Sequence, residues 1–104
     1  MKRVFLIVLD SVGAGALPDA ALYGDEGANT LAHTLEAEHP NLPNLTGMGL
    51  GAIPGIPCAL PATAVGAVGR AAERSAGKDT TTGHCEMSGI TLPKALPTFP
   101  DGFP

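Results

Sequence analysis

Apolar residues form one unbroken run near the start of the chain and weaker patterns after it. Residues 4–9, VFLIVL, are apolar at every position and rich in β-branched side chains, which is typical of a strand buried on both faces inside a parallel sheet. Residues 64–71 predict a second strand with Val65 and Val68 as its apolar anchors. The pattern therefore predicts an α/β protein whose first sheet strand is formed by residues 4–9.

A helical pattern follows in the middle of the chain. Asn29 is a residue type that commonly caps helices. Leu31 and Leu35 lie four positions apart, and so on one face of a helix that continues to Glu38. Pro40 disfavours helical backbone in the residue before it, so the helix should end there. Three shorter helices are also predicted: at residues 18–21, at residues 41–48 with Leu42 and Leu45 facing inward, and after Thr82 through Ile90 as far as Pro93.

Asp10 stands directly after the apolar run. Ligand sites of open α/β sheets gather at the carboxyl ends of the strands, and hard divalent cations prefer oxygen donors such as carboxylates. Asp10 is therefore a candidate metal ligand. The alternative is that its side chain caps the turn that follows, and position alone leaves both interpretations open.

Composition narrows the class of protein. The chain has 104 residues with 14 glycines and 10 prolines, only 4% aromatic but 44% hydrophobic residues, which favours a piece of a larger α/β protein over a self-sufficient domain. A net charge of −4 without a basic run disfavours nucleic-acid binding. Two cysteines make no disulfide framework, so we expect a reduced, cytoplasmic setting. No stretch is long and apolar enough to predict a membrane span.

The densest chemistry lies in residues 77–86, GKDTTTGHCE. Threonines at the start of a helix offer capping side chains, and a helix N-terminus binds phosphate readily. One of these hydroxyls could act as a nucleophile if a metal ion or base lowers its pKa. The structural alternative is a capped helix behind a glycine turn. A P-loop is excluded, because Ala72 stands where its first glycine belongs and Asp79 where its hydroxyl belongs.

Four motifs in register resemble the phosphopentomutase family of the alkaline phosphatase superfamily: VFLIVLDSVGAGALPDA, GDEGANTL, GKDTTTGHCE and TFPDGFP. The resemblance covers nearly all of the chain. It implies an α/β/α core in which residues 1–104 form the N-terminal part of the metal-binding catalytic domain, with the first sheet strand and the start of the nucleophile-bearing helix. The cap domain and the C-terminal half of the core would then lie beyond Pro104.

The resemblance also implies a reaction and its residues. The family interconverts ribose or deoxyribose 1-phosphate and 5-phosphate through a phosphothreonine and a bisphosphate intermediate, with two manganese ions and a ribose 1,5-bisphosphate-type activator. By this resemblance Thr80 is the phosphate carrier and Asp10 a manganese ligand. The supporting residues are Lys78, Asp79, Gly83 and His84. Because the other metal ligands and the cap are missing, we expect the isolated chain to be inactive.

The chain departs from the family pattern in two places, and two other functions stay open. Cys85 stands where the family usually has Trp, and residues 27–30 read GANT instead of the usual GSDT. The first alternative is another metal-dependent phosphoryl-transfer enzyme of the superfamily, such as a cofactor-independent phosphoglycerate mutase or a phosphatase. The second is a non-enzymatic binding module.

Overall fold

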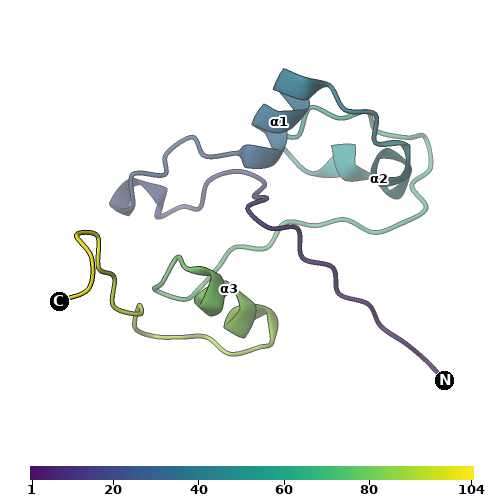
Figure 1. The fold of residues 1–104 in the computed structure, drawn as a ribbon. Helices are drawn as coiled ribbons and strands as arrows, with labels where there is room; N and C mark the ends of the chain where they lie inside the picture. The colour runs from purple at the N-terminus through teal and green to yellow at the C-terminus, as the bar shows by residue number, and fades with distance from the viewer. The chain divides into compact units, whose positions relative to one another are not determined.

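The computed structural model describes residues 1–104, which fall into two compact units, Met1–Arg70 and Ala71–Pro104 (Figure 1). Each unit is described by itself below. The first holds two α-helices and two short 3₁₀ helices, and the second holds one α-helix. In chain order the elements are η1 (Ala20–Leu22), α1 (Thr30–Glu38), α2 (Pro43–Met48), η2 (Leu50–Ala52) and α3 (Thr80–Met87).

Helix α1 begins and ends where its sequence predicts. The Asn29 side chain accepts a hydrogen bond from the Ala32 amide at 3.2 Å, which satisfies one of the unpaired donors of the first turn. At the other end His39 adopts the left-handed conformation with φ +44°, and its amide donates to the Leu35 carbonyl. Asn29 also donates to the Gly55 carbonyl at 3.4 Å. One residue thus caps α1 and connects it to the later loop.

The core of the first unit is small and centres on α1. Ala32, Leu35 and Ile56 are its buried residues. Half-buried neighbours pack against them: Ala14, Leu31, Leu42, Leu50, Ile53 and Cys58. Leu42 faces inward as predicted, but the prediction for Leu45 is wrong, because its side chain is 41% exposed. Helix α2 has only 6 residues, from Pro43 to its left-handed cap at Gly49, and such a short helix presents few positions to the core.

Helix α3 in the second unit starts earlier and ends earlier than predicted. It begins at Thr80, because Asp79 is its N-cap, and ends at Met87. Gly89 has φ +89°, its amide donates to the Glu86 carbonyl, and the Ile90 amide donates to the Cys85 carbonyl. This is a Schellman arrangement, which stops the helix. Ile90 therefore lies outside α3, and Pro93 does not end it.

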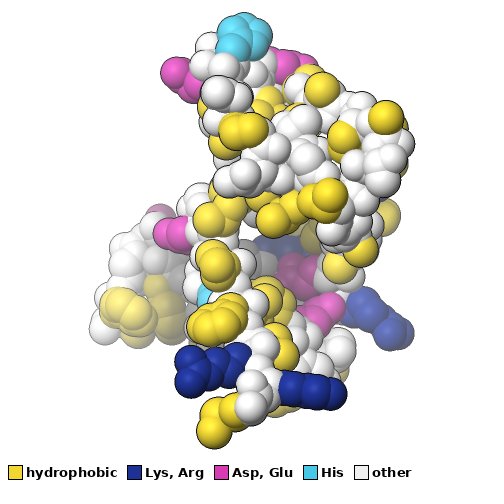
Figure 2. Space-filling model, turned by 90° about the vertical axis from the view of Figure 1, so that its right-hand side faces the viewer, with side chains coloured by type: hydrophobic (Ala, Val, Ile, Leu, Met, Phe, Trp, Pro, Cys, Tyr) yellow, Lys and Arg dark blue, Asp and Glu magenta, His cyan; other side chains and the backbone are white.

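Neither predicted strand is present, so the α/β class is not seen in this structure. Residues 4–9 are extended but unpaired, with side chains between 45% and 95% exposed, and residues 64–71 contain no strand. A strand satisfies its backbone groups only through a neighbouring strand, and residues 1–104 supply none. Figure 2 shows apolar side chains spread over the visible surface. None of the helices has the length and apolarity to cross a bilayer.

Candidate functional site

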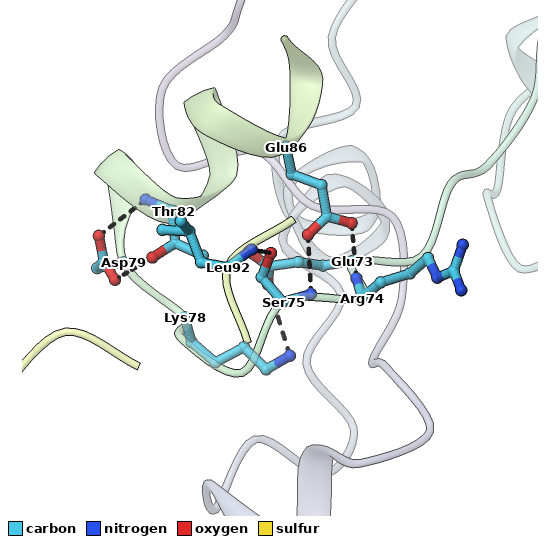
Figure 3. Close-up of polar contacts among 8 residues, drawn as sticks. All are labelled: Glu73, Arg74, Ser75, Lys78, Asp79, Thr82, Glu86 and Leu92. Atoms are coloured by element: carbon cyan, nitrogen blue, oxygen red, sulfur yellow. Dashed lines mark hydrogen bonds and ion pairs between the residues drawn. The ribbon is translucent and has the colours of Figure 1, made fainter. Parts of the chain in front are cut away.

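The start of α3 is fixed by one carboxylate. Asp79 Oδ1 accepts the Thr82 amide at 2.9 Å, and Asp79 Oδ2 accepts the Thr82 hydroxyl at 2.6 Å (Figure 3). Thr82 is completely buried. Hydrogen bonding from the Thr82 hydroxyl, and then from its amide, lowers the pKa of Asp79. We call this pair the Asp79–Thr82 clasp. It makes Thr82 a structural residue, because its hydroxyl is already used.

Thr80 is the first residue of the helix and is exposed. Neither its hydroxyl nor its amide hydrogen-bonds within the chain. An N-terminal helical position carries the partial positive charge of the helix dipole, which favours an anionic group. Of the three adjacent threonines, Thr80 and Thr81 are exposed and Thr82 is not, so the structure separates them into two classes.

His84 lies one turn further along α3, and its Nδ1 is 2.8 Å from the Thr80 carbonyl oxygen. A carbonyl oxygen only accepts hydrogen bonds, so Nδ1 carries the proton that His84 donates. Neutral His84 then keeps its lone pair on Nε2. Together with Thr80, it borders a shallow concavity of the surface, lined also by Thr81, Cys85, Ser88 and Ile90. Cys85 is a half-buried free thiol there.

Two glycines of the segment behave differently. A Cβ atom at Gly77 would lie 2.8 Å from the Thr82 hydroxyl and 2.9 Å from Asp79 Oδ2, so the Asp79–Thr82 clasp requires a residue without a side chain there. A Cβ atom at Gly83 would meet no atom within 4 Å. Steric contacts within the chain therefore require glycine at position 77 but not at position 83.

Lys78 pairs with a residue of the same segment. Its Nζ lies 3.5 Å from Glu73 Oε2, and about a fifth of each side chain is exposed. The second unit thus brings together five of the six predicted site residues, in and immediately before α3: Lys78, Asp79, Thr80, Gly83 and His84. The sixth, Asp10, belongs to the first unit.

Asp10 lies at a turn and is exposed. The Ser11 hydroxyl donates to its Oδ1 at 3.5 Å, and Ser11 has a positive φ of +58°. No group of three or more His, Cys, Asp or Glu side chains that could hold a metal ion is found in residues 1–104. Two manganese ions need many oxygen or nitrogen ligands, and one carboxylate does not supply them. The residues of this chain alone do not fit a two-metal site.

Sequence reasoning missed Glu86. From the last turn of α3 its two carboxylate oxygens accept the amides of Arg74 at 2.6 Å and Ser75 at 2.8 Å (Figure 3). Hydrogen bonding from Ser75, and next from the Arg74 amide, lowers the pKa of Glu86. These partners are 12 and 11 positions away along the chain, so no helical or strand periodicity indicates the contact.

No protein-family model matches the chain. Curated proteins named phosphopentomutase match it along its whole length. The protein from Carboxydothermus hydrogenoformans is 57% identical over 106 residues, and that from Caldanaerobacter subterraneus subsp. tengcongensis is 52% identical over 105; both alignments cover 100% of this chain and 27% of the relative. The protein from Deinococcus radiodurans is 56% identical over 107 residues, with 98% of this chain and 28% of the relative covered. The chain spans about a quarter of the length of these relatives, at their N-terminal end.

Proposed function

We propose that this chain, a homologue of the N-terminal quarter of the phosphopentomutases, carries the phosphate-accepting threonine of such an enzyme and that this threonine is Thr80. The observation that carries the proposal is the placement of Thr80: it is exposed at the first position of a helix whose start is fixed by the Asp79–Thr82 clasp. A phosphoryl group on its oxygen would lie at the positive end of the α3 dipole.

The reaction is a phosphoryl exchange between this threonine and a pentose phosphate. Phosphorylated Thr80 transfers its phosphoryl group to the C1 hydroxyl of ribose 5-phosphate, which breaks the Thr80 O–P bond and forms ribose 1,5-bisphosphate. The Thr80 oxygen then takes the 5-phosphoryl group, which releases ribose 1-phosphate and regenerates the phosphothreonine. Each step forms one P–O bond and breaks another, so the enzyme returns to its starting state.

Lys78 and Gly83 flank the proposed carrier in the sequence, two residues before and three residues after Thr80. A transferring phosphoryl group is stabilised by cations and by backbone donors, and Lys78 stands two residues before Thr80. The absence of any neighbour around a Gly83 Cβ leaves room for a ligand to approach the backbone closely. These residues therefore support the carrier without replacing it.

Asp10 is the one residue of this chain that we propose as a manganese ligand. We propose that this carboxylate contributes to a metal site whose other ligands lie outside residues 1–104, and that residues 4–9 become a sheet strand in the complete α/β core. The exposed apolar surface of residues 4–9 supports the second point. When bound, the metal supplies positive charge that favours deprotonation of a hydroxyl. A cytoplasmic setting is also part of the proposal, because both cysteines are free thiols.

A chimeric enzyme tests the proposed function. In the Carboxydothermus hydrogenoformans relative, the N-terminal segment that matches this chain is replaced by residues 1–104, and the product is called the chimera below. We expect the chimera to interconvert ribose 1-phosphate and ribose 5-phosphate, and the Thr80→Ala variant to have no measurable activity. Thr81→Ala is the matched control and should keep most of it. An active Thr80→Ala chimera would contradict the proposal.

A further inference from the structure

Glu86 connects α3 to the segment that precedes it. Its carboxylate accepts two consecutive backbone amides, one on each oxygen: Arg74 on Oε1 at 2.6 Å and Ser75 on Oε2 at 2.8 Å (Figure 3). Two donors that converge on one ionised carboxylate form charge-assisted hydrogen bonds, which are stronger than neutral ones. The contact therefore fixes both the position and the direction of the backbone at residues 74–75.

Ser75 extends the connection to the segment after the helix. It is only 2% exposed, and its hydroxyl accepts the Leu92 amide at 3.0 Å. The Ala76 amide donates to the Leu92 carbonyl at 3.2 Å. Residues 74–76 are thus held between Glu86 on one side and Leu92 on the other, so the segments before and after α3 are joined around this carboxylate.

The same segment leads within a few residues to Thr80. The segment is held at Ser75 by the hydrogen bond to Glu86, and at Asp79 by the Asp79–Thr82 clasp at the helix start. Helix α3 connects Thr80 to Glu86. The chain from Ser75 to Glu86 is consequently a closed loop that includes Thr80. If the contact at either end of residues 75–79 is lost, the backbone that leads to Thr80 is no longer held in position.

We propose that Glu86 is a positioning residue for Thr80: it holds the segment that delivers the phosphate carrier, without touching the substrate itself. This inference rests on the proposed function of Thr80. A small displacement of a reacting oxygen costs a large factor in rate, because phosphoryl transfer depends on alignment of the attacking and leaving groups. Substrate binding should change much less, since the carboxylate of Glu86 is occupied by the backbone amides of Arg74 and Ser75.

Glu86→Gln in the chimera is the sharpest variant. Glutamine keeps the length of the side chain but has one acceptor oxygen, and its NH₂ group would face a second backbone donor. We expect kcat to fall at least tenfold, KM for ribose 5-phosphate to change less than twofold, and phosphorylation of Thr80 by ribose 1,5-bisphosphate to slow by a similar factor. Glu38→Gln makes the same chemical change at an exposed end of α1 and is the matched control, with unchanged kinetics.

Glu86→Asp is the second variant, since it keeps the charge but has a shorter side chain. The folding of Glu86→Gln and Glu86→Asp is checked by far-ultraviolet circular dichroism at the assay temperature. A folded Glu86→Gln chimera with unchanged kcat would overturn the inference, and so would loss of the fold in both Glu86 variants, because Glu86 would then only stabilise the chain. An unmodified chimera that is inactive and gains no phosphate on Thr80 would instead overturn the proposed function, which keeps the two failures distinct.

Discussion

The carboxylate of Asp79 holds both polar groups of Thr82, the amide at 2.9 Å and the hydroxyl at 2.6 Å. This contact gives the three adjacent threonines different roles. Thr82 is buried and already bonded, whereas Thr80 and Thr81 are exposed. Only the latter two hydroxyls are open to a ligand without breaking the helix start, and the proposed function assigns the phosphate to Thr80.

The first prediction tests this division of roles. Thr82→Val keeps the volume and branching of a completely buried side chain but removes its hydroxyl. Since a hydrogen bond to a charged group is lost, we expect the chimera to lose roughly 1–3 kcal/mol of unfolding free energy and to keep most of its kcat. Urea denaturation measures the loss. Thr81→Val is the control at an exposed position, and an equal loss there would show that the clasp contributes nothing.

The second prediction concerns acid. The pKa values of Asp79 and Glu86 are lowered from their ordinary values of 3.8 and 4.5 by hydrogen bonds made in the folded state. A depressed carboxylate pKa stabilises the fold above the unfolded-state value, and this stability is lost as pH falls through the folded value. We therefore expect the melting temperature of the chimera to fall as pH decreases below about 4.5.

Asp79→Asn supplies the comparison for this acid effect. Asparagine keeps one oxygen for the Thr82 amide but offers no second acceptor for the Thr82 hydroxyl. The variant should melt lower than the unmodified chimera at pH 7, and the difference between them should shrink at low pH. Parallel melting curves in acid, with a constant difference at every pH, would show that the Asp79 charge does not stabilise the helix start.

The third prediction separates the two glycines. Gly77→Ala places a Cβ atom 2.8 Å from the Thr82 hydroxyl, so it should displace the Asp79–Thr82 clasp and lower the melting temperature. Gly83→Ala meets no neighbour and lies inside α3, where alanine stabilises a helix by roughly 0.5–1 kcal/mol relative to glycine. We expect Gly83→Ala to raise the melting temperature while lowering kcat, since under the proposed function a ligand approaches the backbone there. Kinetics and thermal melts of the same preparations measure both effects.

The local signals in the sequence proved to be the informative ones. Asn29 marks the start of α1, and its end near Pro40 was predicted correctly. The threonine run predicts too late a start for α3, because the capping residue is Asp79 and not a threonine. The spacing Asp79-x-x-Thr82 holds the missing signal, since an N-cap side chain bonds to the amide three residues later.

Longer-range features were not predictable in the same way. Residues 4–9 have the composition of a buried strand, but a strand needs a partner strand, and this structure of residues 1–104 contains none. Glu86 binds the backbone of Arg74 and Ser75 across a turn of the chain. Such a contact depends on how the two segments pack against each other. Neither the spacing of apolar residues in the sequence nor the presence of a glutamate at position 86 indicates that packing.

The fourth prediction addresses the metal. Asp10→Asn keeps the size of the side chain but removes its charge, and Asp10 makes only one long contact of its own, with Ser11. We expect the chimera to keep its melting temperature and to bind manganese at least tenfold more weakly in titration calorimetry, because an amide is a poorer ligand than a carboxylate. Asp19→Asn is the control. Unchanged affinity in Asp10→Asn would mean that Asp10 only shapes the turn.

The position of the phosphate tests the assignment of Thr80 most directly. The chimera is incubated with ribose 1,5-bisphosphate, digested, and analysed by fragmentation mass spectrometry across residues 77–86. We expect one phosphoryl group on Thr80, and none on the peptide from the Thr80→Ala variant. Phosphate on Thr81 or Thr82, or an active chimera in which no threonine of this segment is ever phosphorylated, would contradict this assignment.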